Sequence, residues 1–171
     1  MQKRALTLAT TILGVAFVVA CGSDKPTQPA NITYTATLAG ANEKPNAVTT
    51  SATGTFTGTL NPTANTLSWT LTFSGLTSNA TLAHIHGPAD ANTATGVIVN
   101  FANPTGGTGT LTTGATSGTA SGSISLAGAV NSSGTINGDS LKKLLDGGLT
   151  YANVHSANFQ AGEIRGQIHR Q

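Results

Sequence analysis

The sequence predicts an all-β domain, built as an antiparallel β-sandwich or a Greek-key barrel, with one short helix near residues 139–146. Three observations favour this fold class. Apolar and polar residues alternate with a period of two in many short segments, Asn, Pro and Gly separate these segments, and a single segment has helical spacing. Such alternation is typical of strands with one buried face, and such separators are typical of tight antiparallel turns. Many short strands with one helix imply a sandwich or a barrel.

The clearest alternation lies in residues 66–76, TLSWTLTFSGL. One face of this predicted strand carries large apolar side chains: Leu67, Trp69, Leu71 and Phe73. The preceding strand, at residues 52–60, is joined to it by the short turn-rich link 61–65. We therefore expect a β-hairpin whose apolar face covers the core.

The remaining strands show shorter stretches of alternation. They are predicted at residues 32–40, 81–86, 96–101, 117–126, 150–156 and 163–169. The segment 101–122 is rich in Gly and Thr. We expect a long loop there, followed by a Gly-rich strand, because the alternation resumes at Ile124 and Leu126.

One short helix is expected to interrupt the β pattern. Its apolar face is formed by three leucines at spacings of i, i+3 and i+4, namely Leu141, Leu144 and Leu145. Asp139 or Ser140 is expected to cap its N-terminus, and Gly147 is expected to take the left-handed position after its C-terminus. Because the helix is short, packing must stabilise it.

The first twenty residues are typical of an export signal. Lys3 and Arg4 precede an apolar run, residues 6–20, that ends at Cys21. This run is shorter than the ~20 predominantly apolar residues that span a membrane comfortably. Its end, VVAC, resembles the lipobox of bacterial lipoproteins, in which the cysteine is lipidated and becomes the mature N-terminus; the alternative is an ordinary signal peptide. Since Cys21 is the single cysteine of the chain, we expect lipidation at Cys21 and no intramolecular disulfide.

A polar segment with prolines follows the leader. Residues 21–31, CGSDKPTQPAN, are expected to form a flexible tether to a domain at residues 32–171. Of the eight lysines and arginines two lie in the leader, so six remain against six acidic residues. A neutral mature protein lacks the basic stripe that nucleic-acid binding requires. We expect an exported protein held by its lipid anchor at the bacterial cell envelope, on the outer membrane or the cell surface.

Two histidines lie close together in TLAHIHGPA, residues 81–89. Residues i and i+2 of a strand point to the same face about 6.5–7 Å apart, so His84 and His86 are expected to lie side by side. Imidazole nitrogens bind zinc and copper, and His155, on another predicted strand, is the natural third ligand. The alternative is a structural role, because histidines also serve hydrogen bonding and half-buried packing.

Glu163 and Arg165 have the same i, i+2 spacing. We expect a same-face ion pair or bonds to neighbouring strands; alternatively, Glu163 orients a metal-binding histidine. We assign no catalytic residue. No serine lies in a recognisable nucleophile elbow, the one thiol is expected to carry lipid, and the acidic residues are scattered.

Four blocks of the chain agree with one known family. They are LAGANEKP (38–45), ATGTFTGTL (52–60), FSGLTSNATLAHIHGPA (73–89) and LLDGGLTYANVHSANFQAGEIRGQI (144–168). In this order they resemble the CHRD domain, a module named for chordin and widespread in secreted microbial proteins. The resemblance runs from about residue 32 to residue 168, and the Gly- and Thr-rich stretch 104–122 departs from the family pattern.

The resemblance implies a β-sandwich or barrel of immunoglobulin-like or Greek-key type, and it implies no established enzymatic reaction. The family pattern includes five polar residues: His84, His86, His155, Glu163 and Arg165. It therefore implies a shared polar site, which either binds metal or joins the two blocks that carry these residues.

Two functions remain open at this point. The first is a non-enzymatic cell-envelope lipoprotein whose rigid β module uses its loops to bind or adhere to an unknown protein or envelope partner. The second is an extracytoplasmic protein that binds copper or zinc through His84, His86 and His155, with redox activity disfavoured. The two differ in one observable, which is whether the three imidazoles converge on a common point.

Overall fold

The computed structural model describes residues 28–171, so the expected leader, Cys21 and most of the expected tether lie outside the described residues. Within this range the chain forms one ten-stranded sheet with one α-helix. The elements are β1 (Ile32–Ala39), the 3-10 helix η1 (Gly40–Asn42), β2 (Thr53–Asn61), β3 (Thr66–Ser74), β4 (Ala80–His86), β5 (Val97–Asn100), β6 (Gly107–Leu111), β7 (Gly118–Ser125), α1 (Gly138–Asp146), β8 (Tyr151–Ser156), β9 (Ile164–Gln167) and β10 (His169–Arg170).

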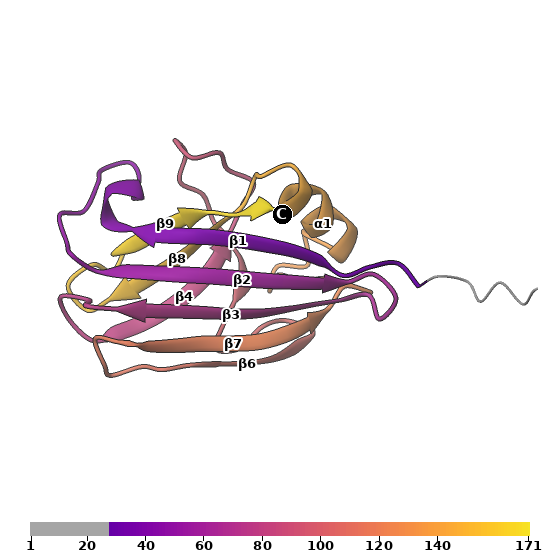
Figure 1. The fold of residues 1–171 in the computed structure, drawn as a ribbon, viewed down its shortest axis with the longest axis horizontal. Coiled ribbons are helices and arrows are strands. Elements are labelled where there is room, and N and C mark those ends of the chain that lie inside the picture. The colour runs from indigo at the N-terminus through magenta and orange to yellow at the C-terminus, as the bar shows by residue number, and fades with distance from the viewer. Residues whose placement is uncertain (1–27) are drawn as a thin grey trace, which may run out of the picture.

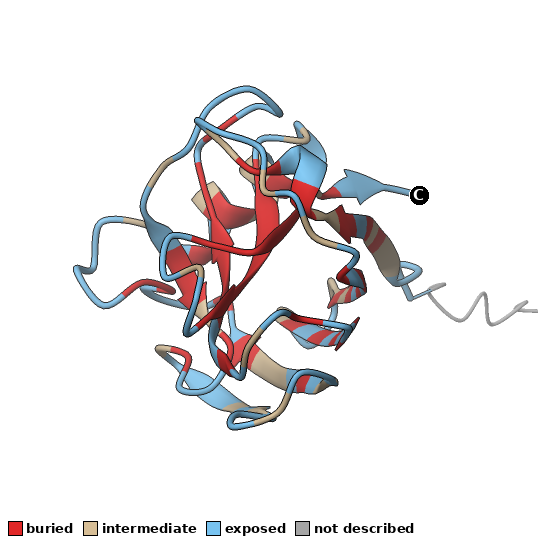
Figure 2. Cartoon of the chain, turned by 90° about the vertical axis from the view of Figure 1, so that its left-hand side faces the viewer, coloured by how far each residue is buried: buried red, intermediate tan, exposed pale blue. Residues whose placement is uncertain are grey.

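The sheet is curled into an open half-barrel. Its strand order is β5-β4-β8-β9-β1-β2-β3-β7-β6, with β10 also paired to β1, and every pairing is antiparallel. Strands β1, β2, β3, β7 and β6 form the layer nearest the viewer, and β4 and β8 lie behind them (Figure 1). Seen from the side, the strands curve around a buried interior (Figure 2). This arrangement confirms the predicted all-β antiparallel fold.

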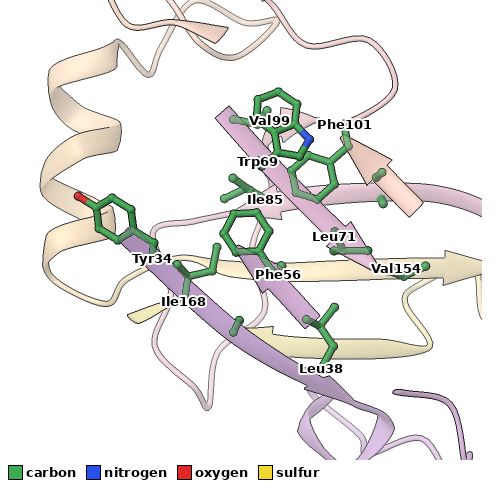
Figure 3. Packing of buried hydrophobic residues seen from close by; sticks show 14 of the residues in the cluster. Tyr34, Leu38, Phe56, Trp69, Leu71, Ile85, Val99, Phe101, Val154 and Ile168 are labelled. Carbon is green, nitrogen blue, oxygen red and sulfur yellow. The ribbon is translucent and has the colours of Figure 1, made fainter. Parts of the chain in front are cut away.

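The predicted alternation sets the core. On β3 the residues Leu67, Trp69, Leu71 and Phe73 are all at most 3 % exposed, and β2 pairs with β3 along its whole length as the expected hairpin. Phe101, just after β5, stacks on Phe56 and on Trp69, with ring centroids 6.0 and 5.2 Å apart (Figure 3). Burying a side chain such as Phe101 stabilises the fold by roughly 1.5–3 kcal/mol. These rings therefore join the layer of β2 and β3 to the end of β5.

Helix α1 is confirmed, but both of its ends differ from the expectation. Asn137 caps the N-terminus, because the helix begins one residue earlier than expected and the Asn137 side chain accepts from the Ser140 amide. At the other end Gly147 stays right-handed, since its amide still bonds to the Lys143 carbonyl, and Gly148 takes the left-handed position with a φ of 64°. The amide of Leu149 then bonds to the Leu144 carbonyl, which completes a Schellman motif. No helix within residues 28–171 has the length and hydropathy needed to cross a membrane.

The expected long loop in 101–122 contains a strand that the sequence did not reveal. Strand β6 pairs with β7 at the edge of the sheet, and all of its residues are exposed or half-buried. Because β6 contributes no large apolar side chain to the core, it carries no alternation signal. Gly109 is required in it, since a Cβ there would lie 1.9 Å from the carbonyl oxygen of Phe101.

Candidate metal centre

The three histidines lie on adjacent strands, on the face of the sheet that points away from the core. His84 and His86 are on β4 and His155 is on β8, and these two strands pair directly. The residues at the alternate positions of these strands, such as Ile85 on β4 and Val154 on β8, are fully buried in the hydrophobic core. Alternation along each strand therefore directs the imidazoles to the opposite face. Each histidine is only 6–7 % exposed.

The imidazoles converge. Nδ1 of His84 lies 3.1 Å from Nε2 of His155, and one ligand atom from each of the three histidines falls within 4.8 Å of the others. The ring centroids of His84 and His86 are 5.3 Å apart, and those of His84 and His155 are 4.9 Å apart. Two of the rings are thus nearly edge-on to His84, an arrangement that lets nitrogens from three rings point toward one region.

Backbone carbonyls fix the tautomers of two histidines. Nδ1 of His86 donates to the carbonyl oxygen of Thr95, and Nδ1 of His155 donates to that of Gln160, both at 2.9 Å. A carbonyl oxygen can only accept, so Nδ1 carries the proton in each ring and Nε2 keeps its lone pair. Histidines that bind metal usually donate their other ring nitrogen in this way. Nε2 of His86 is buried and has no hydrogen-bond partner among the described residues.

Burial keeps these rings neutral. It lowers the pKa of His84 to about 3, assisted by the neighbouring His155 and His86, and it lowers the pKa of His86 to about 4 against an opposing bond to Thr95. The pKa of His155 is also lowered by burial. A neutral imidazole is the form that binds metal, so near pH 7 no proton has to leave the cluster before an ion enters.

The geometry suits a transition-metal ion. Imidazole nitrogens that bind one tetrahedral ion at ~2.0–2.1 Å lie roughly 3.3 Å apart, close to the 3.1 Å between His84 and His155. His86 would then offer Nε2, its free nitrogen. Within residues 28–171 these three histidines are the one set of His, Cys, Asp or Glu side chains grouped closely enough to hold a metal ion.

Tyr151 is a member of the site that the sequence analysis missed. Its ring stacks on His86 with centroids 4.8 Å apart and planes 1° from parallel, and the guanidinium carbon of Arg165 lies 3.5 Å from its centroid. Its hydroxyl donates to the Thr95 carbonyl and accepts from the Thr95 amide. Tyr151 therefore supports both the His86 ring and the segment that orients it. The signal was available, because Tyr151 and His155 have the same parity on one strand.

Glu163 and Arg165 do not pair with each other. The ion pairs among the described residues are Lys142–Asp139 and Arg170–Asp146. Glu163 is fully buried, and its carboxylate accepts from four donors on three residues: the Thr50 hydroxyl, the Thr77 amide and hydroxyl, and the Ser156 hydroxyl. Glu163 has no hydrogen bond to a histidine among the described residues. Backbone carbonyls, and not Glu163, orient His86 and His155.

Arg165 turns instead toward Tyr151 and donates to the carbonyl oxygen of Asp90 at 2.8 Å. Both Glu163 and Arg165 therefore bond to neighbouring segments and not to each other. Cys21, the expected lipidation site, lies outside the described residues.

A comparison with protein-family models matches residues 34–168 to the CHRD domain. This range contains the three histidines, Tyr151, Glu163 and Arg165. Neither the curated proteins nor the solved structures contain a match to the chain.

Proposed function

We propose that the β module of this chain, which belongs to the CHRD domain family, binds one transition-metal ion through His84, His86 and His155. The observation that carries the proposal is the convergence of three neutral imidazoles, one nitrogen of each falling within 4.8 Å of the others.

A purely structural cluster explains this geometry less well. In the metal-free protein the hydrogen bond between His84 and His155 satisfies those two rings, but Nε2 of His86 remains buried without a donor. Leaving a buried acceptor unsatisfied costs about 1–3 kcal/mol, and native structures rarely do so without a reason. A metal ion would supply the missing partner.

The ligand set favours zinc or copper. Imidazole nitrogens suit both ions, whereas calcium and magnesium prefer oxygen. With three protein ligands, a water molecule or an external ligand would complete a four-coordinate sphere. We propose binding without a reaction, and the redox chemistry open to copper stays disfavoured.

Metal titration of the purified full chain tests the proposal. Zinc or copper at 100 times its dissociation constant should stabilise the fold by about 2.7 kcal/mol, which raises the melting temperature by roughly 5–10 °C. His86→Ala should abolish this rise. His169→Ala is the matched control, because His169 is exposed and lies outside the cluster. An equal rise in the wild-type protein and His86→Ala, or no rise in either, would contradict the proposal.

We also propose that the protein is exported and anchored at the bacterial cell envelope by lipid on Cys21, with an unknown protein or envelope partner. Support comes from the leader sequence: two basic residues, an apolar run and a cysteine at its end. Cys21→Ser should yield a product without acyl mass that is released from the membrane fraction. Retention of the membrane-bound, acylated form would exclude Cys21 as the anchor.

A further inference from the structure

One pocket on the surface of the described chain lies outside the histidine cluster. Its volume is about 510 Å³, and it opens on the outer face of the sheet beside β1, β9 and β10. Its wall includes two cationic side chains, Arg165 and Lys44, together with His169 and the amides Asn42, Asn92 and Gln167. No Asp or Glu lines it. A pocket of this size is typical of small-ligand sites.

Arg165 is the unusual member of this wall. It is only 1 % exposed, and its Nη1 has no hydrogen-bond partner among residues 28–171. Nη2 donates to the carbonyl oxygen of Asp90 and, at 3.4 Å, to the side chain of Gln167. No carboxylate oxygen of the described chain lies within ion-pair distance of Arg165. A buried guanidinium without such a partner is costly, unless an anion supplies one.

The two nearest acidic residues are engaged elsewhere. Glu43 is buried and accepts from Asn153, and burial raises its pKa to about 7 in spite of the opposing charge of Arg165. The exposed carboxylate of Asp90 accepts from the Asn92 amide and the Thr93 hydroxyl. Near neutral pH the positive charge of Arg165 is therefore only partly balanced by the protein.

We propose that this pocket binds a small oxyanion, with the guanidinium of Arg165 as the buried donor and Lys44 as the second positive charge. Hydrogen bonds from guanidinium to carboxylate or phosphate oxygens are charge-assisted, and they are about twice as strong as neutral ones. The polar amides of the wall provide further donors. None of the three histidines of the proposed metal centre lines this pocket.

Nitrogen-15 NMR of the full chain tests the proposal, with inorganic phosphate and succinate as the two probes at constant ionic strength. The backbone amides of Lys44, Ala91 and Asn92 should shift and saturate with at least one probe. Saturation with phosphate alone identifies a phosphate site, and tighter binding of succinate identifies a carboxylate site. Amides that fail to saturate with either probe would overturn the proposal.

Two lysine variants distinguish binding in this pocket from general attraction of anions to the protein surface. Lys44→Gln should weaken binding about threefold or more. Lys143→Gln removes the same charge from helix α1, outside the pocket wall, and should leave the affinity unchanged. Arg165→Gln should abolish saturation. Dispersed amide signals in the spectrum of this variant would show that the variant is folded. Equal affinities for Lys44→Gln and Lys143→Gln would overturn the proposal even if Arg165→Gln fails to fold.

Discussion

Nδ1 of His84 lies 3.1 Å from Nε2 of His155, although 71 positions separate these residues in the chain. Since His155 donates its Nδ1 proton to Gln160, its Nε2 can only accept, and His84 must carry the proton on Nδ1 in the metal-free protein. A metal ion bound between the two rings would displace this proton to Nε2 of His84. Metal uptake would thus change a tautomer without changing the number of protons that the three rings carry.

Zinc binding should release almost no protons at pH 6. Three histidines with an ordinary pKa of 6.5 would together carry about two protons at this pH and would release them to the solvent. Here the pKa of His84 is lowered to about 3 and that of His86 to about 4, so the rings are already neutral. Calorimetry at pH 6 in buffers with different ionisation enthalpies measures the number released. A value near two would show that the histidines are protonated in the metal-free protein.

The metal-free protein should lose stability as the pH falls from 6.5 to 4.5. The histidine pKa values are lowered on folding, so the unfolded chain binds more protons below pH 6.5, and each histidine removes at most about 1.4 kcal/mol per pH unit. Glu43 acts in the opposite direction, because folding raises its pKa from 4.5 to about 7 and the folded chain binds its proton first. Three histidines against one carboxyl give a net loss.

Urea unfolding at pH 7, 6, 5 and 4.5 measures this dependence. Glu43→Gln removes the opposing contribution and should make the loss steeper. A free energy of unfolding that rises toward pH 4.5 in the wild-type protein would contradict the assignment of neutral, buried histidines.

Tyr151→Leu should weaken metal binding about tenfold, because it removes the ring that supports His86 and the hydroxyl that holds Thr95. Tyr151→Phe keeps the stacked ring and loses only the hydroxyl, so its effect should be smaller. Competition with a chromophoric zinc chelator gives the affinities. The matched control is Tyr34→Phe, which removes a hydroxyl that donates to Asp146 at the end of helix α1. A larger loss in Tyr34→Phe than in Tyr151→Leu would argue against support by Tyr151.

Glu163→Gln should destabilise the fold by about 2–4 kcal/mol and leave metal affinity almost unchanged. The two carboxylate oxygens accept hydrogen bonds from Thr50, Thr77 and Ser156. In the Gln side chain an NH₂ group replaces one of these oxygens, so a donor would face the donors of these residues. Thermal melts and zinc titration measure the two effects. Asp139→Asn is the control, since its ion pair with Lys142 lies at the surface and contributes little to stability. A tenfold loss of zinc affinity would instead assign Glu163 the role of orienting a histidine.

The sequence predicts much of the fold because β structure has a simple period. Alternation placed Trp69 and its neighbours in the core, and the i, i+2 rule placed His84 beside His86. Strand β6 escaped detection because its Gly and Thr side chains contribute little to the core. The N-cap of helix α1 is Asn137 rather than Asp139 or Ser140, and the left-handed position is Gly148 rather than Gly147, because capping depends on hydrogen bonds that spacing does not encode.

The candidate site was less predictable, since its supporting contacts join distant segments. Two of the three partner residues of Glu163, Thr50 and Thr77, lie on loops whose approach to β9 depends on the curl of the sheet. Stacking of Tyr151 on His86 requires that β4 and β8 be neighbours, and spacing along the chain does not specify this pairing.

The phenol ring of Tyr151 contacts His86 of the proposed metal centre and Arg165 of the proposed oxyanion pocket. An occupant of either site that displaced this ring would therefore alter a contact of the other site. If phosphate or succinate changes the affinity of the protein for zinc by some factor, thermodynamic reciprocity requires that zinc change the affinity for that anion by the same factor.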